Sequence, residues 1–454
     1  MPMLIRCRKA FCLALFLTLS VAPAAPAQEV AQPLGKPELQ DGDCIVFLGD
    51  SITHQCLYTQ YVEDYFYTRF PKMRLKLHNA GVGGAQAWDA LQRFDEDVAA
   101  FHPKYVTILL GMNDGHYQPY DDATFQTYRQ DMTELITQLQ GIGATPIPMT
   151  PTMFDARARR MNPRGNPNEE STTLYNSVLA YYGTWLRDAA QEQGFGFVDM
   201  WSPLNNITLE QRKTDPKFTL IADAVHPGAD GQVVMATAII NDLGLERQVS
   251  NIQVFQQPNG KAKSRVAGGT LSDLTFDDDG VSFTWQADSL PWVLPDDAQL
   301  GVKLTKLGHR LSGERLGVQG LAQGKYKLLI DGSEIGEFPA SAFARRIELQ
   351  ANAATPQYQQ ALEVANLNKQ RNEGPVRSLR GEWSQFQRFA RARRHAQEHP
   401  DDAEAAKQLT EVEAKIEGMT DRAAQHIAAA QEIEDRIFEI NQPPARKYEI
   451  RPVR

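Results

Sequence analysis

Between residues 43 and 245, short apolar runs alternate with longer segments whose apolar positions recur at helical spacing. A short continuous apolar run is typical of a buried strand, whereas apolar residues at i, i+3 and i+4 are typical of a helix. The predicted strands are 44–48, 74–78, 105–110, 145–149 and 196–199, with helices between them and a last helix over 233–243. Strands that alternate with helices predict a parallel sheet covered on both faces. In such a sheet, ligands bind beyond the carboxyl ends of the strands.

After residue 245 the pattern changes twice. Residues 249–352 carry short alternating runs and two hairpin signals, LTFDDDGVSFTW and YKLLIDGSEIGEF, the second with Asp331-Gly332 as its turn. This segment predicts a small antiparallel β unit. Residues 353–442 are rich in Ala, Gln, Glu and Arg at helical spacing and predict a helical region. We expect a C-terminal tail over 443–454, and the pattern indicates no function for these regions.

The first 27 residues have the three parts of a secretory signal peptide. A basic start is followed by an apolar stretch over 10–21 and by the small-residue cleavage pattern Ala25-Pro26-Ala27. We therefore expect an exported protein, periplasmic or extracellular, with a linker over 28–42. No later segment approaches the roughly 20 uninterrupted apolar residues that cross a bilayer.

Composition and charge narrow the functional classes only a little. The chain has 454 residues, of which 42% are hydrophobic and 23% charged, as expected of a soluble protein with two or three units. A net charge of −9 indicates no general affinity for nucleic acid or for an anionic membrane. Cys44 opens a predicted strand and Cys56 lies past its far end, a poor geometry for a disulfide, whose Cα atoms lie within about 7 Å. We expect two unpaired thiols, with a disulfide as the alternative.

The stretch IVFLGDSITHQ, residues 45–55, places Ser51 between the first predicted strand and the helix that follows. A serine at this position is most often a helix cap. It is also well placed as a nucleophile, because it would stand at the carboxyl edge of the sheet, where a helix N-terminus favours negative charge. A serine hydroxyl needs a base, and the base needs an orienting partner, so the rest of the chain must supply both.

The stretch ADAVHPGADG supplies a histidine and a carboxylate just before the closing helix. Asp223 stands three residues before His226, and in a tight turn the two side chains meet. Asp223 then accepts from one imidazole nitrogen and leaves the other free to face a serine. By itself this pair is most often a helix cap and a surface residue.

An acyl-transfer site also needs donors for the oxyanion. NAGVGGAQ, residues 79–86, follows the second predicted strand, and its glycines permit a backbone that aims an amide N–H into a site. LLGMNDG follows the third strand, where the side chain of Asn113 offers an amide donor. The alternatives are a glycine-rich turn for the first stretch and a cap or Asx-turn for the second.

Taken together, these four blocks resemble the SGNH (GDSL-type) esterase and lipase superfamily. The blocks are Gly49-Asp-Ser51-Ile-Thr53, Asn79-Ala-Gly81-Val-Gly83-Gly84, Gly111-Met-Asn113-Asp114 and Asp223-Ala-Val-His226. The resemblance covers roughly residues 43–245 and is specific in order and spacing. It implies a flavodoxin-like three-layer α/β/α domain over 43–248 that needs no metal or cofactor. No G-x-S-x-G elbow, which would indicate an α/β-hydrolase, occurs in the chain.

The resemblance also implies a role for each matched residue. Ser51 is the expected nucleophile, His226 the general base and acid, and Asp223 its orienting carboxylate. The oxyanion hole is expected to consist of the Ser51 and Gly84 backbone N–H groups and the Asn113 side chain. Gly83 competes with Gly84 for the second position.

Several other residues lie close to the predicted site. Asp50 and Asp114 are expected to make supporting hydrogen bonds rather than to react. Three aromatic residues on nearby loops could present a flat surface to a sugar ring or could be packing residues: Trp88, Tyr117 and Tyr120. The arginines of RARRMNPRGNPNEE, after the fourth strand, are expected in a solvated surface loop. His395 and His399 lack a third ligand, so no metal site is predicted.

These observations predict an exported serine esterase that works through an acyl-enzyme. Export, the tendency of the family, the nearby aromatic residues and the absence of a long apolar segment favour removal of O-acetyl or other short acyl groups from a carbohydrate. A lipase, lysophospholipase or thioesterase acting on longer chains is the alternative within the same class. A non-catalytic carbohydrate-binding or scaffold protein on the same fold is the alternative from another class. The acyl group, the alcohol and the oligomeric state are left open by the sequence.

Overall fold

The computed structural model describes residues 35–161, 169–257, 259–277 and 279–453. The predicted signal peptide, residues 1–27, lies outside these residues. Among the described residues, no helix has the length and apolar character needed to span a membrane. Cys44 and Cys56 are both buried and unpaired, which confirms the expectation of two free thiols.

The α/β domain is built on a parallel sheet with strand order β2-β1-β3-β4. Its strands are β1 Cys44–Gly49, β2 Lys76–Gly81, β3 Tyr105–Leu109 and β4 Thr145–Pro148. Every residue of β1 and β3 is buried, so both faces of the central strands are covered. This confirms the predicted parallel α/β class.

Two predicted strands differ from the structure in extent. The second strand was expected over 74–78 but begins at Lys76 and runs on to Gly81, because Asn79, Ala80 and Gly81 continue the pairing with β1. The predicted strand at 196–199 contributes only a single bridge, between Val198 and Met149. The site therefore forms at the carboxyl ends of three full strands.

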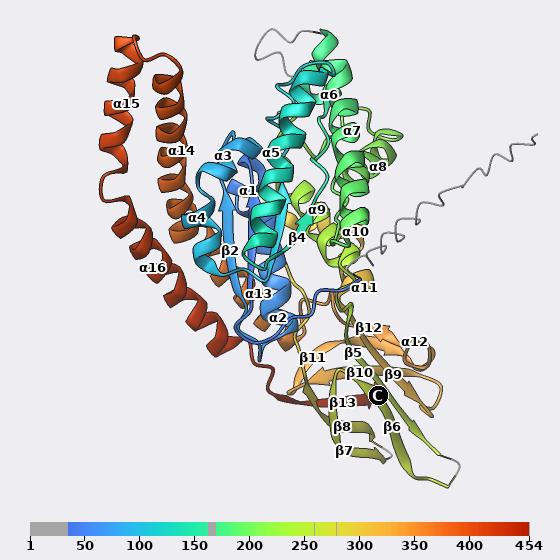
Figure 1. The fold of residues 1–454 in the computed structure, drawn as a ribbon. Helices are drawn as coiled ribbons and strands as arrows, with labels where there is room; N and C mark the ends of the chain where they lie inside the picture. The colour runs from blue at the N-terminus through green and yellow to red at the C-terminus, as the bar shows by residue number, and fades with distance from the viewer. Residues whose placement is uncertain (1–34, 162–168, 258, 278, 454) are drawn as a thin grey trace, which may run out of the picture.

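Helices form between the predicted strands, as expected, and the last predicted helix, 233–243, begins earlier, at Ala229. α2 packs on α9, and α5 packs on α3 and β4 (Figure 1). The helices are α1 Ser51–His54, α2 Leu57–Arg69, α3 Ala87–Gln92, α4 Phe94–Asp97, α5 Asp122–Gly141, α6 Ala156–Met161, α7 Glu169–Gln193, α8 Trp201–Arg212 and α9 Ala229–Asp242, with a 3-10 turn at Ala99–Phe101. The segment after the fourth strand, predicted as a loop, begins with α6, and residues 162–168 of it lie outside the described part of the chain.

The β unit consists of two sheets with their own apolar core. Both predicted hairpins form, as β7–β8 and β10–β11. β5 and β9 pair in parallel, and the chain between them contains three strands and two short helices that pack toward the α/β domain. The elements are β5 Gln248–Gln256, β6 Ala262–Ala267, β7 Gly269–Asp277, β8 Gly280–Ala287, α10 Gln299–Thr305, α11 Leu307–Leu311, β9 Gly313–Gln319, β10 Lys325–Ile330, β11 Ser333–Pro339, α12 Ala340–Arg345 and β12 Ile347–Glu348.

The C-terminal segment 443–454 is not the tail that the sequence predicts. Residues Ala445–Pro452 form β13, which lies between β10 and β8 in the five-stranded sheet. Tyr448 and Ile450 point into the core of the β unit, in the alternating pattern of a half-buried strand. The chain therefore returns to the β unit after its helical region, and the last strand closes that unit.

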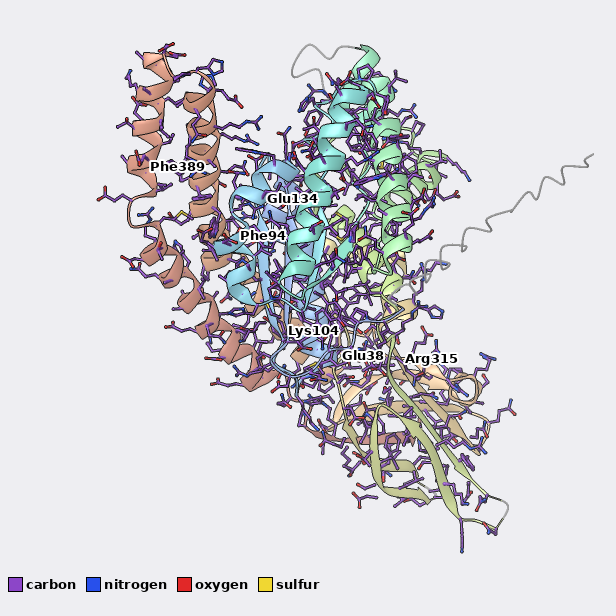
Figure 2. The ribbon with its side chains drawn as sticks, viewed as in Figure 1. Glu38, Phe94, Lys104, Glu134, Arg315 and Phe389 are labelled. Carbon is purple, nitrogen blue, oxygen red and sulfur yellow. The ribbon has the colours of Figure 1, made fainter. Side chains whose placement is uncertain are left out.

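The helical region, which lies between β12 and β13 in the chain, follows the prediction closely. Its helices are α13 Pro356–Arg371, α14 Arg377–Glu398, α15 Ala403–Ile416 and α16 Met419–Ile440. A π-helical turn at Asn372–Val376, which contains Pro375, joins α13 to α14. α14, α15 and α16 form an arm beside the α/β domain (Figure 1). Figure 2 marks the arm at Phe389 and the neighbouring edge of the domain at Phe94.

Buried ion pairs fasten the helical region to the α/β domain. The guanidinium of Arg380 in α14 donates two hydrogen bonds of 2.8 Å to Asp97 at the end of α4. Arg371 in α13 donates to Glu63 in α2 at 3.1 Å. Because all four side chains are buried, the helical region is an integral part of the structure and not an appendage.

Candidate active site

Ser51 lies at the point where β1 ends and α1 begins. The N-cap of α1 is Asp50, whose Oδ1 accepts from the N–H of Ile52 at 2.9 Å. Ser51 is therefore the first residue of the helix, and the capping role that the sequence leaves open belongs to its neighbour. The Ser51 hydroxyl is free for another partner.

That partner is His226. The distance from His226 Nε2 to Ser51 Oγ is 2.8 Å, and the distance from His226 Nδ1 to Asp223 Oδ2 is 2.7 Å. The structure thus brings together the three predicted side chains, which are separated by up to 175 residues in the chain. A serine hydroxyl bonded to an imidazole whose other nitrogen faces a carboxylate is the arrangement that nucleophilic acyl transfer requires.

The turn before α9 sets the Asp223–His226 contact. Ala224 has a left-handed backbone, with φ of 79°, which brings two following N–H groups to Asp223. Its Oδ1 accepts from Val225 N at 2.9 Å and from His226 N at 2.8 Å, leaving Oδ2 for the imidazole. Partial burial alone would raise the pKa of Asp223, but the hydrogen bonds from His226 and Val225 lower it overall. The carboxylate is therefore kept ionised beside the ring.

Two glycines allow α1 to lie directly on the ends of β1 and β2. A Cβ atom on Gly81 would lie 2.6 Å from the backbone carbon of Thr53 and would also collide with the His54 nitrogen. One on Gly49 would collide with the Thr53 side chain. Since no other residue lacks a Cβ, the close approach that places Ser51 at the edge of the sheet requires glycine at both positions.

Asn79 fastens the same junction from β2. Its Nδ2 donates to the Thr53 carbonyl at 2.8 Å and to Thr59 Oγ1 at 3.0 Å, and its Oδ1 accepts from Gly81 N at 2.9 Å. The asparagine of the second block therefore holds α1 and α2 on the sheet. It makes no contact with the reacting groups.

The three predicted oxyanion donors lie at the first residue of α1, in the turn after β2 and in the turn after β3. Among the described residues, the N–H groups of Ser51 and Gly84 donate no hydrogen bond to another protein group. Gly84 has a φ of 69°, a conformation that glycine adopts without strain. The Asn113 amide donates to the Ala85 carbonyl at 3.1 Å, which ties the third block to the second. Their role in binding an oxyanion stays a prediction.

Two buried carboxyl groups support the site, as expected. Asp114 accepts from the N–H of Ala87 at 2.8 Å and so fixes the start of α3, while Asp50 caps α1. Burial raises the pKa of each to about 7. Neither contacts Ser51 or His226 by a hydrogen bond, so both act as structural supports.

Of the three aromatic candidates, only Tyr117 is bonded to a residue of the predicted site. Its hydroxyl donates to Asn113 Oδ1 at 3.0 Å, and its side chain is partly exposed. Trp88 lies beneath the guanidinium of Arg394, whose carbon is 4.6 Å from the ring centre. Tyr120 packs against Tyr181 of α7. A role of any of the three in binding a substrate stays a prediction.

Two side chains that the sequence gave no reason to select reach the second block from α14. Gln387 donates to the Gly83 carbonyl at 2.9 Å, and Arg391 donates to the Gly84 carbonyl at 2.7 Å. They lie more than 300 residues further along the chain, in a region whose sequence shows only helical periodicity. No local signal could have found them.

Metal ligands do not gather in the described part of the chain. No group of three or more His, Cys, Asp or Glu side chains there could hold a metal ion. The rings of His395 and His399 stack with centroids 4.5 Å apart, in a surface-exposed pair.

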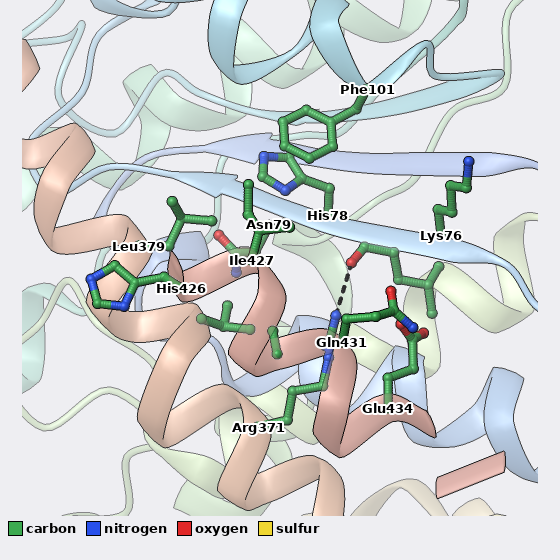
Figure 3. Close-up of a pocket in the computed structure, with 13 residues that line it drawn as sticks. Lys76, His78, Asn79, Phe101, Arg371, Leu379, His426, Ile427, Gln431 and Glu434 are labelled. Atoms are coloured by element: carbon green, nitrogen blue, oxygen red, sulfur yellow. Dashed lines mark hydrogen bonds between the residues drawn. The ribbon is translucent and has the colours of Figure 1, made fainter. Parts of the chain in front are cut away.

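A pocket of 190 Å³ opens beside β2 and does not include Ser51, His226 or Asp223 (Figure 3). Arg371 reaches across it to the Leu77 carbonyl at 3.4 Å, and the His78 ring stacks on Phe101. None of the predicted catalytic, oxyanion-hole or aromatic residues lines this pocket, although Asn79, which holds α1 and α2 on the sheet, does. It belongs to the junction between the sheet edge and the helical region.

Comparison with known families places the site within one matched segment. Residues 47–234 match the model of the GDSL-like lipase/acylhydrolase family. That segment contains all of the predicted catalytic and oxyanion-hole residues. An acetylxylan esterase from Geobacillus stearothermophilus is 25% identical over 232 residues, which are 46% of this chain and 97% of that protein.

One solved structure extends the similarity beyond this segment. A gut microbial diltiazem-metabolizing enzyme is 29% identical, with a TM-score of 0.78, over 93% of this chain and 100% of its own. A crystal structure of the Geobacillus stearothermophilus acetylxylan esterase is 24% identical over 46% of this chain and 97% of its own, with a TM-score of 0.37. The first of these similarities takes in most of the β unit and helical region.

Proposed function

We propose that this ester hydrolase, whose residues 47–234 belong to the GDSL-like lipase/acylhydrolase family, removes acetyl or other short acyl groups from a carbohydrate. The observation that carries the proposal is the pair of hydrogen bonds that links Ser51 to His226 and His226 to Asp223. The similarity to an acetylxylan esterase supports the acetyl group and the sugar. The partial exposure of Tyr117, which is bonded to Asn113, supports a sugar ring at the site.

In this mechanism, Ser51 Oγ attacks the ester carbonyl carbon while His226 Nε2 takes the hydroxyl proton. The carbonyl oxygen becomes an oxyanion that accepts from the N–H groups of Ser51 and Gly84 and from the Asn113 side chain. The bond between the carbonyl carbon and the sugar oxygen then breaks, His226 gives its proton to that oxygen, which leaves as a hydroxyl group, and an acyl-enzyme remains. Water, deprotonated by His226, attacks this ester and releases the acid and Ser51.

Asp223 takes part without accepting the proton itself. Its carboxylate holds the Nδ1–H of His226 and stabilises the imidazolium that forms twice in each cycle. The low pKa of Asp223 suits this role, because a protonated carboxyl group could not stabilise the positive ring.

A small-molecule ester is a second candidate substrate. The observation that favours it is the similarity, over 93% of this chain, to a diltiazem-metabolizing enzyme. We further propose export to the periplasm or the outside of the cell, on the strength of residues 1–27.

Acetate release tests this proposal. Protein beginning at residue 28 is incubated with acetylated xylan and with p-nitrophenyl acetate, butyrate and octanoate, beside Ser51→Ala as the control. We expect release of acetate, a steep fall in kcat/KM beyond the acetyl ester, and a loss of at least roughly 10³-fold in kcat in the variant. A preference for octanoate would identify a lipase-like enzyme instead. Equal inactivity of folded wild type and variant would favour a binding protein.

A further inference from the structure

The turn that carries the predicted second oxyanion donor is held from outside its own domain. Gly83 and Gly84 follow β2, and a Cβ atom on either would meet nothing within 4 Å. The side of each glycine on which a Cβ atom would stand is therefore open. What does contact the turn is α14, which brings Gln387 to the Gly83 carbonyl at 2.9 Å and Arg391 to the Gly84 carbonyl at 2.7 Å.

The contact with Gly83 bears directly on Gly84. The Gly83 carbonyl and the Gly84 N–H belong to one peptide group, which is planar and trans, so the two bonds point in opposite directions. Fixing the carbonyl against Gln387 therefore fixes the direction of the N–H, which points away from α14. A hydrogen bond accepted by the carbonyl also polarises the same peptide and strengthens its N–H as a donor.

Arg391 connects α14 to the start of α3 as well as to the Gly84 carbonyl. Its Nε and Nη2 bond to Asp89 Oδ1 at 2.8 Å and Oδ2 at 2.6 Å, and the Asp89 side chain is fully buried at the start of α3. Asp89 Oδ2 also accepts from Gln86 N at 2.8 Å. One arginine thus joins α14 to the Gly84 carbonyl and to the helix that follows the turn.

Gln387 itself is a costly residue for a purely structural purpose. It is buried, and among the described residues its Oε1 has no hydrogen-bond partner. A buried acceptor left unpaired is unfavourable, so an apolar side chain would serve packing better. Its one bond in the structure is the bond to Gly83.

We infer that Gln387, supported by Arg391, is a positioning residue for the oxyanion hole, which it controls through the Gly83–Gly84 peptide. This inference rests on the proposed function, in which Gly84 N–H is a donor. It gives the helical region a part in catalysis: α14 completes the geometry of a site whose reacting groups all lie within residues 47–234.

The test compares Gln387→Met, which keeps the length of the side chain and removes the donor, with Gln385→Met. Gln385 is a matched control, because it lies on the same helix and donates no hydrogen bond among the described residues. We expect Gln387→Met to lower kcat for p-nitrophenyl acetate by about 10- to 100-fold with KM within about twofold, because oxyanion contacts form in the transition state. Gln385→Met should leave both constants unchanged, and thermal unfolding shows that each variant folds.

A second readout separates this inference from the choice of substrate. A fluorophosphonate reacts with an activated serine and places its phosphoryl oxygen in the oxyanion hole, whatever ester the enzyme prefers. We expect Gln387→Met to slow labelling of Ser51 by at least about tenfold. Wild type that labels rapidly but releases no acetate would overturn the proposed substrate and leave the inference intact. Equal labelling rates and equal kcat in wild type and Gln387→Met would overturn the inference alone. Should Gln387→Met not fold, Gln387→Glu, whose carboxylate cannot donate to Gly83, takes its place.

Discussion

Asp97 holds together two positively charged side chains at the junction of the α/β domain and the helical region. Its Oδ2 accepts from Arg93 at 2.6 Å and from Arg380 at 2.8 Å, and its Oδ1 accepts from Arg380 at 2.8 Å and from His78 at 3.1 Å. The side chains of Asp97, Arg93 and Arg380 are 0% exposed. Asp97→Asn keeps the shape of the side chain and removes the charge that both guanidinium groups face.

The expected loss of stability is large because the charges left behind have no access to water. Removing one partner of a buried ion pair costs about 3–5 kcal/mol, and here one substitution leaves two cations uncompensated. We expect Asp97→Asn to lower the free energy of unfolding by about 5 kcal/mol, a large part of the roughly 5–15 kcal/mol that stabilises a domain. For a domain of this size, that corresponds to a fall in Tm of about 10 °C or more.

The chain offers a matched control for burial. Arg74 and Asp435 also form an ion pair of 2.6 Å between the α/β domain and α16, but their side chains are 51% and 53% exposed. Exposed pairs of this kind contribute about 0–1 kcal/mol, so Asp435→Asn should shift Tm by only a degree or two. Thermal and urea unfolding followed by circular dichroism compare the two variants. Equal shifts would refute the reasoning, which attributes the large effect at Asp97 to the burial of its charged partners.

The pH dependence of stability provides a second test of the same contact. Burial alone would raise the pKa of Asp97, but Arg380, His78 and Arg93 lower it well below its usual range. A carboxyl group with a lowered pKa stabilises the fold above its unfolded pKa of about 4 and loses that contribution as the pH falls toward the folded pKa. The wild type should therefore lose stability below about pH 4 more steeply than Asp97→Asn.

Three further predictions concern single positions. Gly81→Ala should abolish most activity in folded protein, because its methyl group would collide with the His54 nitrogen and displace α1; esterase assay and circular dichroism measure the two effects. Burial raises the pKa of Asp50 to about 7, so between about pH 4 and 7 the folded state holds a proton that the unfolded state has released. The free energy of unfolding should therefore decline by the order of 1 kcal/mol for each pH unit over that window. Asp50→Asn should remove this decline. An unchanged slope in urea unfolding against pH would contradict this account. Cys44 and Cys56 should resist thiol reagents in native protein and react after unfolding, because burial raises the pKa of both to about 12.

The α/β domain was predictable because its signals are local. Each strand of a sheet buried on both faces is a short apolar run, and the SGNH blocks stand where such runs end. The recognition of that superfamily is confirmed by the family match and by the parallel sheet. The geometry of Ser51, His226 and Asp223 follows from this order of elements, whereas their chemical roles await the assays above.

The parts that were missed depend on contacts between distant segments. The last strand, β13, reads as a tail after two prolines, and its partners β8 and β10 lie more than 100 residues earlier. Gln387 and Arg391 lie in a helix whose sequence looks like any solvated amphipathic helix, and their partners are backbone carbonyls that leave no trace in sequence. Asp50 rather than Ser51 caps α1, a choice between adjacent residues that only backbone geometry decides.

The most direct test of the account is to trap the acyl-enzyme. Protein incubated with an acetyl ester is quenched in acid within the first turnover, digested, and examined by mass spectrometry, with Ser51→Ala treated in parallel. The account predicts one acetyl group on the peptide that contains Ser51 and none on that peptide of the variant. An active wild type that carries acetyl on another residue, or a Ser51→Ala variant that still turns over at the wild-type rate, would contradict it.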